Sequence, residues 1–527
     1  MPSVVIPSVN LRILEFSAIS VTQANGLFHT SPGQRPGYVR QKSILQAESL
    51  PHIVRRAPIP FFPFVSFGRA AAMSSTPEAT LLENNAPAST APSLKRVIGV
   101  SELSFAAFNN IVGSGIFGLP ALVAALLGPA AILSYLVCAV LIGLLGLCFA
   151  EVGSRVASAG GLYAYARVPF GPVVGGIAGT LLWFATSVMP SAAVANFFIV
   201  TLATIWPVVG TAAPRALILG AVYLLLVVVN IRGTSSGAHL SVAMALVKLT
   251  PLVFLVVAGT FAVHVPNLHW TSMPSAKATG QGAVLLLFAF MGIEGGLNTS
   301  GEIKDPARTV PRAIAMTLTL VSALYISLQF VAQGVLGADL ANAKAPLVAT
   351  ATAVFGPWGT RLLLAATILS AAGYLTSDIL CNPRIMYALA EAGQLPRKLA
   401  FVHPRFGTPA VAIGTYAALC FLVAVTGSFR QLVIMSSAGT LVLYLVCCLG
   451  LLQLRRRKVA MAGEPFHAPG GRYVPLAAAV IMVWLLTTLE WIELGATAGL
   501  VIVSGVVYGI IGRIRAMRRE NDQGPKN

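Results

Sequence analysis

The chain has 527 residues, of which 56% are hydrophobic and 10% charged, and its formal net charge is +18. This composition excludes an ordinary water-soluble domain, in which about a quarter of the residues are charged. The positive charge does not indicate a nucleic-acid partner, because the basic residues lie in the tails and in loops between apolar segments. Those segments are roughly 20 residues long, enough to cross a hydrocarbon layer of about 30 Å. We therefore predict an all-α integral membrane protein.

Residues 1–94 mix proline, serine, arginine and short apolar pieces and contain no convincing membrane span. We expect them to form a disordered cytoplasmic segment. The first part is poor in acids, as a transit peptide would be, but its prolines interrupt any long amphipathic helix. The composition changes at Met73, and a start site placed too early explains the preceding residues better than a targeting signal does. The transmembrane domain then covers 95–513, and 514–527 form a basic cytoplasmic tail.

The pattern of apolar runs predicts twelve transmembrane helices. Every second loop between them is rich in lysine and arginine, and such loops remain on the cytoplasmic side of a membrane. We therefore expect both termini in the cytoplasm and the protein in the cell (cytoplasmic or inner) membrane. The expected spans are 98–125, 129–152, 172–205, 215–231, 237–263, 281–300, 311–337, 357–389, 408–426, 429–453, 473–491 and 494–513.

The first span contains residues that disfavour a continuous helix, in the stretch 109–120 with Gly113-Ser114-Gly115, Gly118 and Pro120. An unpaired backbone group in the hydrocarbon costs several kcal/mol, so a helix that only had to anchor would avoid this composition. One interpretation is a discontinuous helix whose freed N–H groups meet an anionic ligand near the middle of the membrane. The alternative is close helix packing through small residues.

A second interruption is predicted in the sixth span, where 288–296 includes Gly292, Gly295 and Gly296. Two glycine-broken spans five apart have opposite orientations, because five is odd. Such a pair is typical of two inverted repeats of five helices each. The second break therefore favours discontinuous helices 1 and 6 over simple close packing.

Five motifs in this order resemble the amino acid–polyamine–organocation superfamily of transporters, over about residues 97–513. They are 113–117 in the first span, Phe149-Ala150-Glu151 with 160–163 after the second, 288–294 in the sixth, 302–308 with Pro311-Arg312 after it, and 383–388 through 407–409 after the eighth. The resemblance implies a leucine-transporter-like fold with a 5+5 inverted repeat and two additional helices. It also implies alternating access to a central amino acid.

The resemblance further implies how the amino acid binds. Its carboxylate would meet the backbone N–H groups of Gly113, Ser114 and Gly115, and its ammonium the carbonyl groups around Ile111, Phe288 and Met291. This assignment agrees with electrostatics, because the N-terminal ends of half-helices attract carboxylate and unpaired carbonyl groups attract ammonium. Phe288 also matches a gating aromatic position of the family, although an isolated phenylalanine in a span usually packs in the core.

Three residues are candidates for ion or proton coupling. Lys248 in the fifth span resembles a lysine that replaces a structural sodium ion in proton-coupled relatives; the alternative is a side chain that snorkels to an interface. Glu294 either locks the unwound part of the sixth span or carries a proton. Ser370 lines the same cavity as Lys248 if the resemblance holds, but a membrane serine more often bonds to its own helix.

Two further polar features lie inside the expected spans. Asp378 either faces an aqueous path or caps one half of its helix, and the sequence does not choose between these. Gln329 and Gln333 lie one turn apart in the seventh span, and we expect them to face protein rather than lipid.

We conclude from the sequence that the protein is no enzyme, because it has no Walker motif, metal-ligand cluster or nucleophile–base arrangement. It also needs no cofactor. The first hypothesis is proton-coupled symport of a neutral or small amino acid, with the amino acid, protons and the lipid bilayer as partners. The alternatives are an amino acid or polyamine exchanger, an amino-acid-sensing receptor and a channel. The sequence does not assign the oligomeric state.

Overall fold

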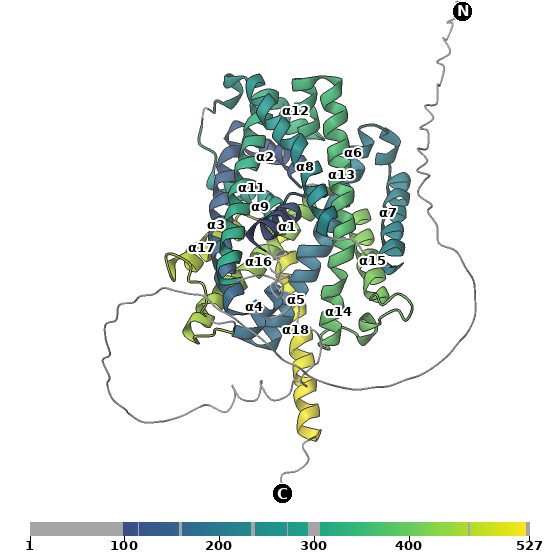
Figure 1. Cartoon of the computed structure of the whole chain (residues 1–527), viewed down its shortest axis with the longest axis vertical. Helices are drawn as coiled ribbons and strands as arrows, with labels where there is room; N and C mark the ends of the chain where they lie inside the picture. The colour runs from purple at the N-terminus through teal and green to yellow at the C-terminus, as the bar shows by residue number, and fades with distance from the viewer. Residues whose placement is uncertain are drawn as a thin grey trace, which may run out of the picture. The chain divides into compact units, whose positions relative to one another are not determined.

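The computed structural model describes most of the chain after the N-terminal segment. Residues 1–98, which include the segment expected to be disordered, lie outside the described residues, as do Ser114 and Glu294. The described ranges are 99–113, 115–156, 161–232, 238–270, 272–292, 306–461 and 464–522. All regular secondary structure within these ranges is helical (Figure 1).

The first half of the described region contains eight α-helices. A π-helical segment, η3, interrupts the helix that continues from α5 into α6. Pro172 begins α5, and a proline is tolerated there because the first N–H group of a helix has no partner within the helix. The elements are α1 (Val100–Ile111), α2 (Gly115–Leu127), η2 (Gly128–Ala131), α3 (Ile132–Arg155), α4 (Gly161–Phe170), α5 (Pro172–Thr180), η3 (Leu181–Val188), α6 (Met189–Ala203), η4 (Pro207–Gly210), α7 (Ala212–Arg232) and α8 (Ala238–Gly259).

In the second half, proline again begins several helices, and Gly356, with φ +65°, turns the chain between α12 and α13. The elements are η5 (Thr260–Ala262), η6 (Val265–Leu268), α9 (Ala276–Phe290), α11 (Pro306–Leu336), η8 (Gly337–Asn342), α12 (Pro346–Phe355), α13 (Pro357–Cys381), α14 (Pro383–Glu391), η9 (Arg397–Ala400), α15 (Ala410–Thr426), α16 (Phe429–Arg456), α17 (Tyr473–Thr487) and α18 (Trp491–Asp522).

Seven described helical segments are long and apolar enough to cross a membrane, and five shorter apolar helices accompany them. One of the seven, Gly115–Arg155, contains both α2 and α3. The prediction of an all-helical membrane protein is therefore confirmed.

Burial separates central helices from peripheral ones. The most apolar window of Phe429–Arg456 is 72% buried inside the protein, whereas that of Ala212–Arg232 is only 11% buried. Leu217 and Leu224 of α7 are 73% and 65% exposed, and Figure 1 shows α7 at the edge of the helices. In a membrane these leucines contact lipid, which is as apolar as a protein core.

One buried ion cluster joins the ends of α3 and α16. The Glu151 carboxylate is fully buried and accepts hydrogen bonds from Nε of Arg155 at 2.9 Å and Nε of Arg455 at 2.8 Å. The backbone N–H of Ala468 donates a third bond at 2.9 Å. The carboxylate thus connects two helices and the segment between α16 and α17.

We expect Glu151→Gln to destabilise the protein by about 3–5 kcal/mol, because it leaves two largely buried guanidinium groups without their counter-charge. The loss should appear as a clear fall in the thermal unfolding midpoint of the purified protein. Glu391→Gln is the matched control, since Glu391 is exposed and bonds only to its neighbour Tyr387 at 2.6 Å among the described contacts. Equal, small shifts in both variants would contradict a structural role for the cluster.

Candidate functional site at two helix ends

The first predicted interruption coincides with a helix boundary. Helix α1 ends at Ile111 and α2 begins at Gly115. Between them the N–H of Val112 still bonds to the Phe108 carbonyl oxygen at 2.8 Å, but the N–H of Gly113 turns back to the Ile111 carbonyl oxygen at 2.7 Å. The helical hydrogen-bond ladder therefore stops after Val112. Ser114 lies outside the described residues.

The second predicted interruption also begins at a helix end. Helix α9 ends at Phe290, and Met291 has an extended backbone with φ −65° and ψ 151°. Gly292 follows with φ +107°, a conformation that favours glycine over residues with a side chain. Residues 293–305, including Glu294, lie outside the described residues, so the structure describes only the first part of the sixth expected span.

The two helix ends contact each other. A Cβ atom placed on Gly115 would lie 3.0 Å from the Phe288 ring and 3.6 Å from Cα of Ala289. Gly115 thus allows the start of α2 to approach the end of α9 more closely than a larger residue would. Helices α2 and α9 pack along each other, and Figure 1 shows both near the centre of the helices. Two segments far apart in the sequence meet at the positions where both were expected to break.

Tyr325 of α11 connects the two helix ends. Its fully buried hydroxyl group lies 3.2 Å from the Ile111 carbonyl oxygen and 3.1 Å from the Ala289 carbonyl oxygen, and it donates to both. Sequence analysis missed this residue. A signal was present, because Tyr325, Gln329 and Gln333 follow at intervals of four and form a polar line along one helix face. Both glutamines are buried, as predicted.

Met291 reaches α16, which in turn bonds to the π-helical segment. Its sulfur atom lies 3.6 Å from the hydroxyl oxygens of both Ser436 and Thr440. The Ser436 hydroxyl also bonds to the Ala185 carbonyl oxygen in η3 at 2.7 Å. π-helical turns such as η3 often occur at functional sites. Sequence analysis missed Ser436 and Thr440, whose only signal is their spacing of one turn in an apolar span.

Comparison with known proteins identifies the family. A family model described as "Amino acid permease" matches residues 98–511, which is most of the chain. The chain belongs to the amino acid permease family. Its members are transporters and not enzymes, so the resemblance stated from the motifs and the prediction of a non-enzyme are both confirmed.

Several curated proteins are similar to this permease over most of their length. The serine/threonine exchanger SteT of Bacillus subtilis is 29% identical over 373 residues, which cover 69% of this chain and 84% of SteT. The branched-chain amino acid permease BcaP of the same species is 25% identical over 80% of this chain and 94% of its own. The methylthioribose transporter of that species is 25% identical over 84% and 98%, respectively.

Phe288 packs between the two helix ends of the permease and α16. Its side chain is 7% exposed, and its ring meets the Phe429 ring edge to face at 6.3 Å. On the other side it lies against Gly115. The residue is thus in contact with both interrupted segments.

The expected coupling residues of the permease lie on helices around the site. Lys248 is only 4% exposed on α8, which packs against α1 and α13, so the alternative of a lysine that snorkels to the surface does not hold. Ser370 on α13 is fully buried, and its hydroxyl has no hydrogen-bond partner among the described residues. It therefore does not bond to its own helix, which is the common arrangement.

Helix α13 also reaches the first helix end. A Cβ atom on Gly113 would lie 3.5 Å from the Tyr374 ring, one turn beyond Ser370. Ile111, Gly113, Gly115, Phe288 and Met291 therefore lie together, surrounded by α11, α13 and α16. Ser370 and Lys248 come from two helices that flank this group.

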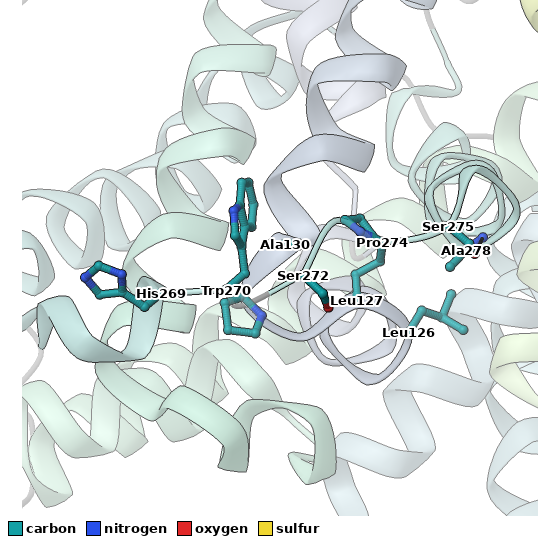
Figure 2. Close-up of a pocket in the computed structure, with 10 residues that line it drawn as sticks. Leu126, Leu127, Ala130, His269, Trp270, Ser272, Pro274, Ser275 and Ala278 are labelled. Carbon is teal, nitrogen blue, oxygen red and sulfur yellow. Dashed lines mark hydrogen bonds between the residues drawn. The ribbon is translucent and has the colours of Figure 1, made fainter.

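A surface cavity of about 440 Å³ lies away from these residues, at the far end of α2. Its lining includes Leu126 and Leu127 of α2, Ala130 of η2, and His269, Trp270 and Ser272 from the residues before α9 (Figure 2). None of the predicted binding or coupling residues lines it. The cavity therefore does not replace the helix ends as the candidate site.

We expect Gly115→Ala to impair transport, because the new methyl group lies 3.0 Å from the Phe288 ring and forces the start of α2 and the end of α9 apart. Overpacking of this kind costs about 1–3 kcal/mol, which corresponds to a loss of roughly 5- to 150-fold in substrate affinity or rate. The measurement is uptake by cells that express equal amounts of each variant. Gly143→Ala in α3 is the control, since nothing lies within 4 Å of its added Cβ. Normal uptake by both variants would contradict the importance of this contact.

Proposed function

We propose that the permease is a secondary active transporter that moves a neutral or small amino acid together with protons by alternating access. The observation that carries this proposal is the contact between the two helix ends, where Gly115 meets Phe288 and Tyr325 bridges the carbonyl groups of Ile111 and Ala289. Backbone groups that leave the helical hydrogen-bond ladder at such a helix end can exchange their present partners for a charged ligand.

The proposed architecture has twelve spans in a leucine-transporter-like fold, with two inverted repeats of five helices. In this scheme α1 and α2 form the discontinuous first span, and α9 is the first half of the discontinuous sixth span. The helix boundaries at Ile111, Gly115 and Phe290 support it. The basic loops support cytoplasmic termini in the cell membrane.

In the proposed binding mode, the substrate carboxylate meets the N–H groups of Gly113, Ser114 and Gly115. The substrate ammonium meets the carbonyl groups of Ile111, Phe288 and Met291. Within the structure, the N–H of Gly113 bonds to the Ile111 carbonyl oxygen at 2.7 Å. A zwitterion would replace this bond with one hydrogen bond to each group, so neither backbone group is left unpaired.

The side chains around the helix ends favour an uncharged substrate side chain. Phe288, Met291, Tyr325, Ser436 and Tyr374 are all uncharged. A cationic side chain of a substrate would lose its hydration here without gaining a counter-charge from these residues. Small polar groups such as the Ser436 hydroxyl suit a neutral polar or small apolar side chain.

Proton coupling is assigned to Lys248, with Ser370 and Glu294 as additional candidates. Lys248 is 4% exposed in a membrane helix, and ionisable residues inside such helices often take part in proton relays. Its position on α8 beside α1 and α13 allows a change of charge to act on the first helix end. This is the link between protonation and substrate that symport requires.

Exchange is the second candidate function. SteT, a serine/threonine exchanger, is similar to the permease over 69% of this chain. An exchanger needs no proton gradient, because one amino acid leaves as another enters. The similarity to BcaP and to the methylthioribose transporter adds branched-chain amino acids and methylthioribose to the substrates that should be tested.

The first test is uptake of radiolabelled serine, threonine and leucine into proteoliposomes that contain the purified permease. We expect saturable accumulation that requires an inward proton gradient and stops when a protonophore is added. Empty liposomes and proteoliposomes with the Gly115→Ala variant are the controls. Uptake that requires preloaded amino acid but no gradient would establish exchange and overturn symport.

The second test addresses the coupling residue. We expect Lys248→Met to abolish accumulation driven by the proton gradient, because methionine keeps the apolar stem but cannot bind a proton. Counterflow of labelled substrate against preloaded substrate should persist. Lys344→Met, which removes an exposed lysine, is the control. Gradient-driven accumulation at the normal level in Lys248→Met would remove this residue from the coupling mechanism.

A further inference from the structure

Asp378 is a buried carboxyl group outside the proposed binding site. It lies on α13 and is 5% exposed. The Tyr416 hydroxyl on α15 lies 3.1 Å from each of its two oxygens, and Nδ2 of Asn382 donates to Oδ1 at 2.6 Å. The acid therefore lies in the last turn of α13, buried between helices.

Four helices contribute to this cluster. Ser191 of α6 faces the carboxyl group, and its hydroxyl lies 3.2 Å from the Tyr223 hydroxyl on α7. Tyr416 belongs to α15, and Asp378 and Asn382 lie at and just beyond the end of α13. A change of charge at Asp378 thus acts directly on the packing of α6, α7, α13 and α15.

The titratable groups around Asp378 are mostly neutral. They are Tyr416 and Cys420 of α15, Tyr223 of α7, and Tyr374 and Cys381 of α13 itself. The nearby cations are Arg384 of α14, which faces Cys381, and Lys248 of α8, which packs against α13. Helices α6 and α12 present no titratable side chain.

Within the described part of the chain, no lysine, arginine or histidine forms an ion pair with Asp378. Glu151, by contrast, is held by two arginines. An ionised carboxylate buried without a cation is costly, whereas the protonated acid is much cheaper to bury. Uncharged donors alone do not remove this difference.

The geometry around Asp378 accommodates both forms of the acid. Asn382 donates to Oδ1 in either form. The Tyr416 hydroxyl donates to the carboxylate when Asp378 is ionised, and it accepts the proton of Oδ2 when Asp378 is protonated. Gain or loss of one proton therefore requires rotation of a hydroxyl group but no repacking of the acid itself.

The cluster is also connected to the first helix end. Tyr374, whose ring lies against Gly113, precedes Asp378 by one turn on the same face of α13. The two residues are thus separated by about 6 Å along the helix axis. The charge on Asp378 and the position of the Gly113 backbone are linked through one helical turn.

We propose that Asp378 is a proton-binding site of the permease, which takes up a proton from water in one state of the transport cycle and releases it in another. Its use in transport rests on the proposed function, but the binding of the proton does not. The site is distinct from Lys248 and from the backbone groups of the helix ends. Its ligand is the proton alone, held between Asn382, Tyr416 and Ser191.

The test is a pH titration of the purified permease in lipid nanodiscs, followed by infrared difference spectroscopy of the carboxylic acid C=O band. We expect a band that disappears as the pH rises, is missing in Asp378→Asn and is shifted in Asp378→Glu. Asp339→Asn is the control, because Asp339 is exposed and its loss should not affect this band. If the wild type and Asp378→Asn give the same titrating bands, Asp378 does not exchange a proton and the inference is overturned.

A second variant keeps the test decisive if Asp378→Asn fails to fold. Tyr416→Phe removes the hydroxyl that contacts both oxygens, so the ionised form loses a donor and the band should persist to higher pH. An unchanged titration in Tyr416→Phe would contradict the assignment of the band to Asp378.

Uptake separates this inference from the proposed function. If both hold, gradient-driven uptake depends on pH in the wild type, loses that dependence in Asp378→Asn and regains it in Asp378→Glu. If the wild type proves to be an exchanger but the Asp378 band titrates, the proton site stands and symport fails. If uptake is gradient-driven but no titrating band belongs to Asp378, symport stands and the site fails.

Discussion

The hydroxyl group of Tyr325 satisfies the constraint on which the centre of the permease depends. A broken helix leaves backbone carbonyl groups without partners, and the membrane interior offers no water to replace them. One buried hydroxyl serves the carbonyl groups of Ile111 and Ala289, which belong to two helix ends far apart in the sequence. Helix α11 thereby holds both ends in a fixed relation. The contact of Gly115 with Phe288 and the packing of α2 on α9 join the same two regions.

The two interpretations of the first glycine-rich stretch, a helix interruption and close helix packing, are compatible. The helix boundary between Ile111 and Gly115 agrees with an interruption. Gly118, only three residues later, lies inside α2, and a Cβ atom there would come within 2.6 Å of the Phe197 ring. This glycine serves close helix packing. A single short motif therefore contains glycines for both purposes, and the spacing alone did not separate them.

Features that depend on neighbouring residues were predictable from the sequence, and features that depend on distant partners were not. Apolar length and glycine or proline positions indicated the helical membrane class and the ends of α1 and α9, since helix propensity and hydrogen-bond loss are local effects. The partners of those ends, Tyr325 and Ser436, come from other helices. Glu151 and Arg455 are likewise 304 residues apart in sequence. Asp378 was identified in the sequence, but a choice between its two interpretations required knowledge of which helices pack against α13.

The contrast between Glu151 and Asp378 shows how one membrane protein uses buried acids in two ways. Two arginines fix the charge of Glu151, so its carboxylate stays ionised and joins α3 to α16 as a permanent connection. Asp378 has hydroxyl and amide partners that accept either of its forms, and its charge is free to change. A permanent charge suits a fixed contact between helices, whereas a variable charge suits helices that must repack. Asp378 lies on α13, which also reaches the first helix end through Tyr374, so a proton bound there acts one turn from the place where the substrate is proposed to bind.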